Sequence, residues 1–404
     1  MRILSITAQK PHSTGSGTYL TELVRAFDRK GAKQAVVAGI YRDDDVSLPL
    51  GVDFYPVVFS CGDSEGDISF PIAGMSDVMP YVSTRYRDLT DEMIAEFEKA
   101  FLTQIEKAVE DLDPDIILCH HLFLLTAAVR NHFPDRKIYG ICHGTDLRQM
   151  VNCDRIAAGI RAEIRKLDHV FALHGEQAES IKSIFGMDED AITVIGSGFN
   201  DHLFNTEGRI RHSRSEPVRV CYAGKMSCPK GVPELLAALT DLNFGDGVAP
   251  FEVRLAGGCK DESVRCLLAD LPGNIQYLDQ IPQSQLADLF KTSDIFVLPS
   301  YFEGLNLAVI EAMASGLLPI CTDLPGMKEW VDASVKDPNI RYIPMPEMSA
   351  IDTPTDAGRT RFTEDLKSIL RNAINDVYND TTQPVPDCSG ITWDSVAANI
   401  LQDM

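Results

Sequence analysis

Residues 294–321 read DIFVLPSYFEGLNLAVIEAMASGLLPIC, and this stretch decides the fold. The apolar run Asp294–Leu298 has the length and composition of a buried strand. Asn306 can cap a helix, and the apolar residues 307–314 that follow it have helical character. A second apolar run, Leu318–Cys321, predicts another strand. A strand, a helix and a strand in this order predict two parallel strands joined by a crossover helix.

The same alternation extends along the rest of the chain. Further strands are predicted at residues 2–8, 35–40, 115–119, 137–142, 169–173, 191–195, 218–223, 251–256 and 274–278. Helical periodicity is present at residues 89–112, 233–242, 261–271, 284–292 and 364–378. The polar segment 196–217 interrupts the pattern, and we interpret it as an interdomain linker.

Two Rossmann-like domains of an α/β protein follow from this pattern. We expect an N-terminal domain over residues 1–200, completed by an amphipathic helix near residues 391–404, and a C-terminal domain over residues 201–390. Open parallel sheets bind ligands beyond the carboxyl ends of their strands. In a protein of two such domains, the expected binding site is the central cleft that the domains face.

Charge and composition exclude several classes of protein. The 404 residues include 37 basic and 59 acidic side chains, a net charge of −22, and both halves of the chain are acidic. Such a chain repels nucleic acids and anionic lipids, so we expect no nucleic-acid partner and at most peripheral membrane contact. The ten cysteines form no C-x-x-C pair, and no apolar run approaches the ~20 residues of a membrane span. These features favour a cytoplasmic protein.

Common cofactor motifs are missing. Gly15-Ser16-Gly17 follows the first predicted strand, but Leu20 stands where a dinucleotide fingerprint needs its third glycine. The chain also lacks a P-loop, a G-x-S-x-G elbow and an H-E-x-x-H motif. We therefore expect no nicotinamide cofactor.

The loop and helix after the strand Asp294–Leu298 can bind a polar ligand. Backbone N–H groups of Gly304, Leu305 and Asn306 precede the helix, where they suit phosphate or sugar hydroxyls. Glu311 is a carboxylate in an otherwise apolar helical turn, and two hydroxyls of a sugar would satisfy its charge. The alternative is that Glu311 faces solvent at one edge of the helix.

Two lysines follow the strand 218–223 and precede the next helix. In a strongly acidic protein, Lys225 and Lys230 at this place indicate a local anion site, for which a diphosphate is a natural guest. Both could instead be ordinary surface residues.

The N-terminal half has a glycine loop and three histidines at strand ends. Gly15 and Gly17 lie in the loop between the first strand and the first helix, where the backbone can approach a ligand. His143 follows the strand 137–142 and could contact a substrate hydroxyl, although a structural role is the more common one. Structural roles are also expected for His120 and His121.

These residues together carry a family resemblance. Glu303 and Glu311 are separated by seven residues, and Lys230-Gly231, Gly257-Gly258 and His143-Gly144 stand at the expected places along the chain. The set resembles the E-x7-E signature of retaining glycosyltransferases of the GT-B fold, especially glycosyltransferase family 4.

The resemblance implies a hexosyltransferase that uses a nucleoside-diphosphate sugar and needs no metal. Glu311 would hold the ribose, and Glu303 would lie near the donor sugar. Lys230 and Lys225 would neutralise the leaving diphosphate. The remaining implied contacts are His143 with the transferred sugar and Gly15, Gly17, Gly257, Gly304, Leu305 and Asn306 with the donor. The anomeric configuration would be kept through a front-face path, and the acceptor would be an unidentified hydroxyl compound.

Three departures from the family pattern concern phosphate and base recognition. Lys225 replaces the usual arginine and lacks its bidentate fork. The usual N-G-V-D motif is replaced by Ser197-Gly198-Phe199-Asn200, and a usual glycine near the base pocket is replaced by Asp279. Two alternatives to the transferase remain open at this point. One is a GT-B-like epimerase or phosphorylase, and the other is a non-catalytic subunit that binds nucleotide-sugars.

Overall fold

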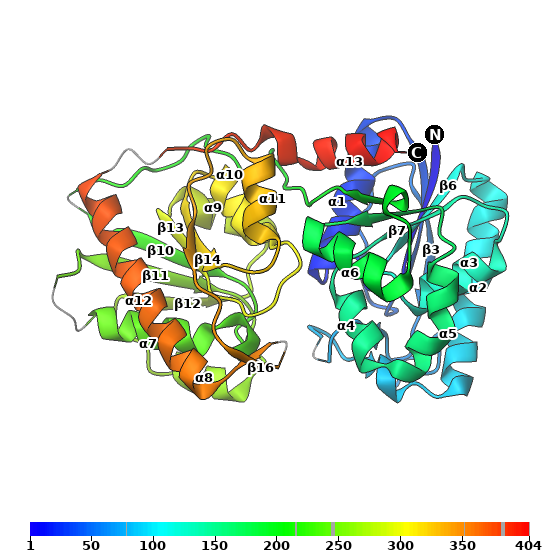
Figure 1. Cartoon of the computed structure of the whole chain (residues 1–404), viewed down its shortest axis with the longest axis horizontal. Helices are drawn as coiled ribbons and strands as arrows, with labels where there is room; N and C mark the ends of the chain where they lie inside the picture. The colour runs from blue at the N-terminus through cyan, green and yellow to red at the C-terminus, as the bar shows by residue number, and fades with distance from the viewer. Residues whose placement is uncertain (78, 215, 244–246, 351, 381–383, 404) are drawn as a thin grey trace. The chain divides into compact units, whose positions relative to one another are not determined.

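The computed structural model describes residues 1–77, 79–214, 216–243, 247–350, 352–380 and 384–403. It contains two compact units, unit 1 (Met1–Gly198 with Trp393–Met404) and unit 2 (Phe199–Thr392). Each unit is built on one parallel sheet with helices on its faces (Figure 1), so the predicted pair of Rossmann-like α/β domains is confirmed. Met404 of the predicted terminal helix and Ser215 of the predicted linker lie outside the described residues.

The sheet of unit 1 has the order β3-β2-β1-β6-β7-β8-β9, and all its pairs are parallel. Its strands are β1 (Arg2–Thr7), β2 (Lys33–Ile40), β3 (Asp53–Val58), β6 (Ile116–His120), β7 (Ile138–Ile141), β8 (His169–Ala172) and β9 (Ile192–Val194). The strand order reverses beside β1, so the loops after β1 and β6 diverge and leave room for a ligand. The sequence did not predict β3, whose Pro56 is tolerated because the strand lies at the sheet edge.

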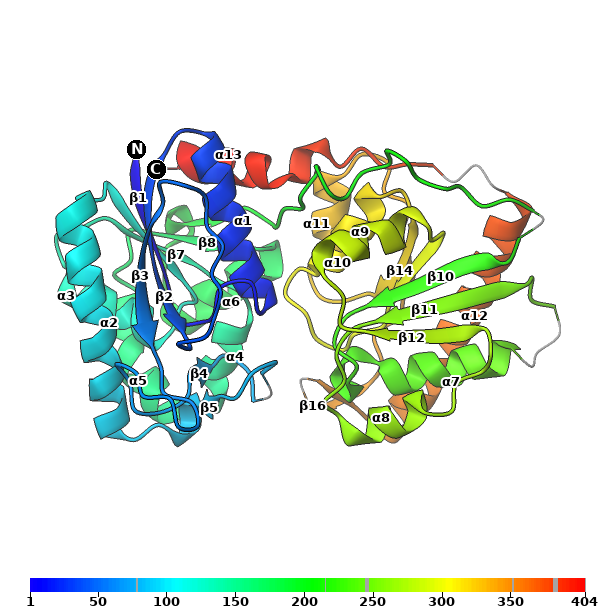
Figure 2. The same cartoon turned by 180° about the vertical axis from the view of Figure 1, so that it is seen from behind.

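Helices cover both faces of this sheet. They are α1 (Gly15–Arg29), α2 (Asp91–Leu112), α3 (Leu124–His132), α4 (Thr145–Asn152), α5 (Asp154–Ile164) and α6 (Gly175–Phe185). Val36 of β2 packs in a cluster with Leu20 of α1, whereas its neighbour Val37 belongs to the cluster of Phe101 in α2. Successive residues of a strand face opposite sides, which is why this strand is apolar throughout. Figure 2 shows α1 on one side of the sheet and α2 on the other. A short pair, β4 (Ala73–Gly74) and β5 (Thr84–Arg85), lies outside the sheet.

Unit 2 repeats the same topology with the order β12-β11-β10-β13-β14-β15. Its strands are β10 (Val218–Ala223), β11 (Phe251–Ala256), β12 (Ile275–Asp279), β13 (Ile295–Leu298), β14 (Leu318–Thr322) and β15 (Arg341–Ile343), with a separate hairpin of β16 (Met348–Ala350) and β17 (Thr353–Pro354). Its helices are α7 (Val232–Asn243), α8 (Glu262–Leu268), α9 (Gln283–Lys291), α10 (Leu307–Ala314), α11 (Met327–Ser334) and α12 (Asp356–Asn379). Figures 1 and 2 show α9, α10 and α11 on one face of the sheet and α7, α8 and α12 on the other. The order reverses beside β10, so the loops after β10 and β13 flank the expected ligand site.

The segment predicted as a linker is mostly part of unit 2. Phe204 is fully buried, and a guanidinium nitrogen of Arg209 donates to the carbonyl oxygen of Ser315 at 3.1 Å. The linker interpretation is therefore wrong for residues 199–214. Its polar and basic composition concealed these packed side chains.

The C-terminal helix α13 (Trp393–Gln402) packs on α1 of unit 1. The ring of Trp393 lies 4.7 Å from that of Tyr19, and Arg29 binds the carboxylate of Asp394 at 2.6 Å. Position 198 requires a glycine, because a Cβ there would lie 2.7 Å from the Trp393 ring. Across the described residues, no helix is both long enough and apolar enough to cross a bilayer.

Candidate functional site

The predicted site residues of unit 2 lie on loops that leave the carboxyl ends of β10, β11 and β13, except Glu311, which lies on helix α10. Two glycines let these loops pack backbone against backbone. Gly231 has φ of +64°, and a Cβ there would lie 2.1 Å from the carbonyl oxygen of Pro299. Gly257 has φ of +146°, and its Cβ would lie 1.7 Å from the carbonyl oxygen of Gly224. Only glycine fits these places, so both residues fix the geometry of the site.

Lys230 and Glu303 form an ion pair across the point where the strand order reverses. Lys230 ends a short 3-10 helix after β10, and its Nζ lies 2.5 Å from Oε1 of Glu303, which follows β13. Asn306 donates from its side-chain amide to the same carboxylate at 2.7 Å. Both members of the pair are half-buried. The structure thus joins two residues that the sequence placed in separate motifs.

Glu311 lies inside unit 2 and not at an exposed helix edge. Its residue is only 6% exposed, and its neighbours Ile310 and Ala312 on α10 are fully buried. Gln283 of α9 donates to its carboxylate over a long 3.5 Å. The solvent-facing alternative is therefore wrong. The hydroxyls of a bound sugar are further donors from which this carboxylate can accept hydrogen bonds.

The N-terminus of α10 presents backbone donors beside the ion pair. The side chain of Asn306 caps the helix by accepting from the N–H of Ala308 at 2.9 Å. Within the part of the chain that the structure describes, no acceptor is found for the backbone N–H groups of Gly304, Leu305 and Asn306. Unpaired donors at a helix N-terminus favour an anionic or hydroxyl ligand.

Three lysines make the surroundings of Glu303 positive. Lys225 is exposed, yet desolvation by the nearby chain and then the charge of Lys230 lower its pKa. Lys260 adds to this lowering, and the sequence analysis did not identify it as a site residue. Its signal was the Gly257-Gly258 turn after β11, which brings the next residues to the same edge of the sheet as Lys225 and Lys230.

Asp279, which stands where the family pattern has a glycine, lies at the end of β12. Its carboxylate accepts a hydrogen bond from the hydroxyl of Tyr277 at 3.1 Å.

The glycine loop of unit 1 differs from the prediction. Helix α1 already begins at Gly15, so Gly15 and Gly17 lie in its first turn and not in a loop. The N–H of Gly17 donates to the side-chain oxygen of Thr14 at 3.1 Å, and this bond caps the helix. Gly17 is still constrained, because a Cβ there would lie 2.5 Å from the carbonyl oxygen of Lys10.

Three histidines and a tyrosine gather at the carboxyl ends of β6 and β7. The His143 ring is half-buried, and its Nε2 lies 3.1 Å from Nδ1 of His120. The His121 ring centre lies 4.6 Å from that of His143, and the Tyr19 ring meets His143 edge-on at 5.1 Å. Burial lowers the pKa of His143 to about 3 and holds the pKa values of His120 and His121 well below the usual range. The cluster is therefore uncharged near neutral pH.

Asp146 positions His143, and the sequence analysis did not single it out. It is fully buried in the first turn of α4 and accepts from the backbone N–H of Leu122 at 2.8 Å and of His143 at 3.2 Å. Burial raises the pKa of this carboxyl, and the hydrogen bonds that it accepts oppose the shift. Asp146 joins the loops after β6 and β7. Its signal was its place three residues after His143, in the run His143-Gly144-Thr145-Asp146.

In the described ranges, no three His, Cys, Asp or Glu side chains are arranged to hold a metal ion.

Sequence families match the two units separately. Residues 13–203 match the family described as Glycosyltransferase Family 4, and residues 217–343 match Glycosyl transferases group 1. TuaC of Bacillus subtilis, assigned by its name to teichuronic acid biosynthesis, is 28% identical over 54% of this chain and 55% of its own length. A D-inositol 3-phosphate glycosyltransferase of Nocardia farcinica is 25% identical over 42% of this chain and 40% of its own. The chain thus spans about half the length of the curated relatives that it matches.

Solved structures match the whole chain at low identity. Sucrose-phosphate synthase from Thermosynechococcus elongatus has a TM-score of 0.68 at 16% identity, over 100% of this chain and 98% of that one. The Anabaena protein HepE, in complex with UDP and glucose, has a TM-score of 0.62 at 14% identity, over 100% of this chain and 98% of that one. At these identities the likeness shows the fold.

Proposed function

We propose that this chain, which has the GT-B fold, is a family 4-like glycosyltransferase that transfers a hexose from a nucleoside-diphosphate sugar to a hydroxyl acceptor. The observation that carries the proposal is the Lys230–Glu303 pair at the reversal of the strand order in unit 2. Beside it lie unpaired backbone donors and a buried carboxylate, which together suit a diphosphate and a sugar diol.

The donor would bind to unit 2 in three parts. Glu311 would accept hydrogen bonds from the ribose hydroxyls, which replaces its long contact with Gln283. Lys230 and Lys225 would lie against the diphosphate, with the N–H groups at the start of α10 as further donors. Glu303 would lie near the transferred sugar and keep Lys230 in place before the donor arrives.

Catalysis would be electrostatic. As the bond from the sugar to the diphosphate breaks, negative charge grows on the leaving oxygen, and a lysine already held in position stabilises that charge without reorganisation. We propose retention of the anomeric configuration, with the leaving phosphate accepting the proton of the acceptor, and no requirement for a metal. The choice of a nucleotide-sugar donor draws on two solved structures of the same fold, one in complex with UDP and glucose and one bound with UDP-2-fluoro glucose.

Unit 1 would supply contacts to the sugar and the acceptor. His143, kept neutral by burial, can exchange hydrogen bonds with a hydroxyl without placing a charge beside it. The acceptor is a hydroxyl compound of unknown class, and the excess of acidic residues favours one that is not anionic.

A nucleotide panel followed by product analysis tests the proposal. Thermal melts with UDP, GDP, ADP and TDP, each with and without EDTA, should show one stabilising nucleotide and no effect of EDTA. A ligand at ~100 times its dissociation constant adds ~2.7 kcal/mol to the free energy of unfolding. The matching nucleotide-sugar should then yield free nucleoside diphosphate and an α- or β-glycoside with the donor's configuration by NMR. Conversion of the sugar without an acceptor would instead indicate an epimerase, and binding without turnover would indicate a binding subunit.

A further inference from the structure

Unit 2 has a second polar pocket, far from the residues discussed above. It is a cavity of about 110 Å³ at the amino ends of the strands, lined by Thr206, Arg209, Arg211, His212, Asp294, Val377 and Val385. Asp294 directly precedes β13, whereas Glu303 follows the other end of the same strand. Because a strand rises ~3.3 Å per residue, the four residues of β13 separate the two edges by roughly 13 Å.

The single carboxylate among the lining residues is already paired. Arg219 of β10 binds Asp294 in bidentate geometry, with its Nε 2.9 Å from Oδ2 and a terminal nitrogen 2.8 Å from Oδ1. The backbone N–H of Arg219 donates to the same carboxylate at 2.9 Å. Asp294 is therefore held chiefly by Arg219, and its single negative charge does not balance Arg209, Arg211 and Arg219 together.

Two arginines contribute those cations. Arg209 is held by the carbonyl oxygens of Ser315 at 3.1 Å and Ser293 at 3.5 Å, and its buried Nε has no partner. Neither Arg209 nor the exposed Arg211 forms an ion pair with a carboxylate among the residues that the structure describes. Burial lowers the pKa of Arg209 to about 10, the carboxylate of Asp294 opposes this shift, and the charges of Arg211 and Arg219 add to it. Three arginines thus share one carboxylate, and an anion that binds between Arg209 and Arg211 reduces the repulsion between them.

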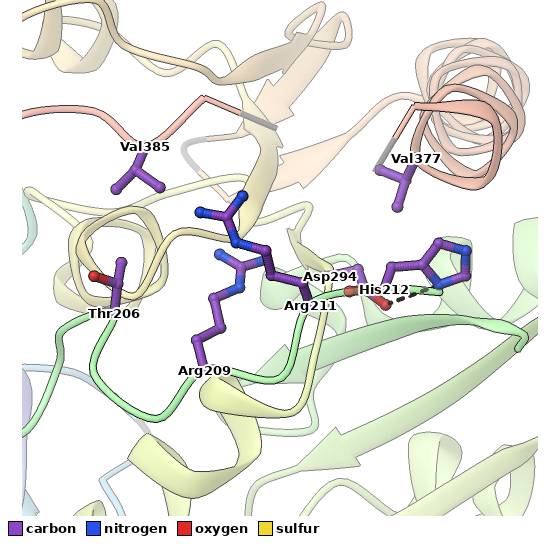
Figure 3. Close-up of a pocket in the computed structure, with 7 residues that line it drawn as sticks. All are labelled: Thr206, Arg209, Arg211, His212, Asp294, Val377 and Val385. Atoms are coloured by element: carbon purple, nitrogen blue, oxygen red, sulfur yellow. Dashed lines mark ion pairs between the residues drawn. The ribbon is translucent and has the colours of Figure 1, made fainter. Parts of the chain in front are cut away.

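A buried histidine with unused nitrogens completes the pocket. His212 is 7% exposed, and neither ring nitrogen has a hydrogen-bond partner among the described residues. Its Nδ1 lies 3.9 Å from Asp294, which is too long for a hydrogen bond. Figure 3 shows His212 and Val377 on one side of the two arginines and Thr206 and Val385 on the other. The pocket thus combines two cations, one spare imidazole and short apolar walls.

We propose that this pocket binds a phosphoryl group of a small molecule, held by Arg209, Arg211 and His212. Guanidinium groups match the oxygens of phosphate in bidentate geometry, and a phosphomonoester carries about −1.5 to −2 charges at pH 7, close to the charge of two arginines. A cavity of ~150 Å³ takes a molecule the size of benzene, so this pocket has room for a phosphoryl group and excludes a nucleotide. The site lies outside the donor site of the proposed function and does not depend on it.

Calorimetric titration with inorganic phosphate, at constant ionic strength, tests the proposal on the full chain. We expect saturable binding that Arg211→Gln weakens at least tenfold. Arg211 is exposed and without a partner, so this change leaves the fold intact. His212→Phe keeps a ring of similar size and should weaken binding as well. Arg361→Gln is the matched control, because Arg361 is 86% exposed on α12 and the change removes the same charge.

Two further arms separate this site from the lysines near Glu303 and identify the source of the phosphoryl group. Lys230→Ala should retain the binding that Arg211→Gln loses. Titration with glycerol phosphate as a second probe shows whether the pocket prefers a phosphorylated metabolite or free phosphate. Either preference supports the proposal that the pocket binds a phosphoryl group. Equal phosphate affinity in Arg211→Gln and wild type, or equal losses in Arg211→Gln and Arg361→Gln, would overturn the proposal.

Discussion

Nδ1 of His120 lies 3.1 Å from Nε2 of His143, and the two rings are stacked with 14° between their planes. Nε2 of His120 is buried without a partner among the described residues. A proton on that nitrogen would be an unsatisfied buried donor, which is costlier than a bare lone pair. The His120 proton therefore belongs on Nδ1, where it donates to His143 and leaves the His143 proton on Nδ1.

This relationship predicts the tautomer of His143. Nitrogen-15 NMR of the histidine rings at pH 7 should show His143 protonated at Nδ1 and His120 protonated at Nδ1. In His120→Phe the constraint is gone, so His143 should populate both tautomers and kcat should fall by about tenfold with little change in KM. His120→Asn restores a donor and should recover part of the rate. Protonation of His143 at Nε2 in the wild type would contradict the assignment.

The histidine cluster also predicts how stability depends on pH. Burial lowers the folded-state pKa values of His120, His121 and His143. At mildly acidic pH the unfolded chain therefore binds more protons than the folded chain. The free energy of unfolding is therefore highest above the unfolded-state pKa of ~6.5, and it decreases as the pH falls below that value. The slope is about 1.4 kcal/mol per pH unit for each histidine. Urea unfolding between pH 7 and pH 5 should show this decline, and His121→Phe should reduce the slope by about one proton. His202 is exposed, so His202→Phe should leave the slope unchanged.

Lys230→Ala should reduce kcat at least ~100-fold, the cost of one preorganised group that stabilises transition-state charge. The change leaves Glu303 hydrogen-bonded to Asn306, so the melting temperature should move little. Steady-state kinetics with the identified donor measure the effect, and Arg361→Ala serves as the charge-matched control. A loss below fivefold would mean that another group holds the diphosphate.

Glu311→Gln should separate stability from binding. Glutamine has nearly the shape of the glutamate that it replaces, so the ligand-free variant should melt close to wild type even though Glu311 is only 6% exposed. The amide accepts hydrogen bonds less strongly, so the affinity for nucleoside diphosphate should fall about tenfold or more. Thermal melts and calorimetry check the two effects independently. Unchanged nucleotide affinity would exclude Glu311 from the ribose site.

Gly257→Ala should distort the phosphate side of the site. The new Cβ would lie 1.7 Å from the carbonyl oxygen of Gly224, which is backbone and cannot rotate away. We expect a loss of about 1–3 kcal/mol in the free energy of unfolding and reduced nucleotide binding. Gly273→Ala is the control, since a Cβ there meets nothing within 4 Å. Equal effects of the two changes would show that the loop contact is unimportant.

Local patterns predicted most of the buried apolar strands and several of the helices. The expected helix 307–314 has the observed bounds of α10, because Asn306 supplies its own cap. The edge strand β3 was missed because its proline is unusual in strands, and β15 because it has only three residues. Helix α1 begins at Gly15 because Thr14 caps it, although glycines suggested a loop.

The chemistry of the site depended on pairings that a sequence does not reveal. Lys230 and Glu303 are 73 residues apart, and they meet only because β10 and β13 are neighbours in the sheet. Burial of Glu311 required the packing of α10 against its sheet, which an isolated helical pattern leaves undetermined. The arginines of the phosphate pocket had been assigned to a linker, because polar composition is ambiguous between an exposed segment and a lining of charged groups.

Helix α13 has a consequence for how the protein is made. Unit 1 is discontinuous, and the Trp393 that packs on Tyr19 is synthesised after the whole of unit 2. A ribosome adds ~5–20 residues per second, so the roughly 190 residues of unit 2 delay α13 by about 10 to 40 s. During that interval the surface of α1 that α13 covers is exposed on the nascent chain. The domain that is translated first is therefore the last to acquire its complete core.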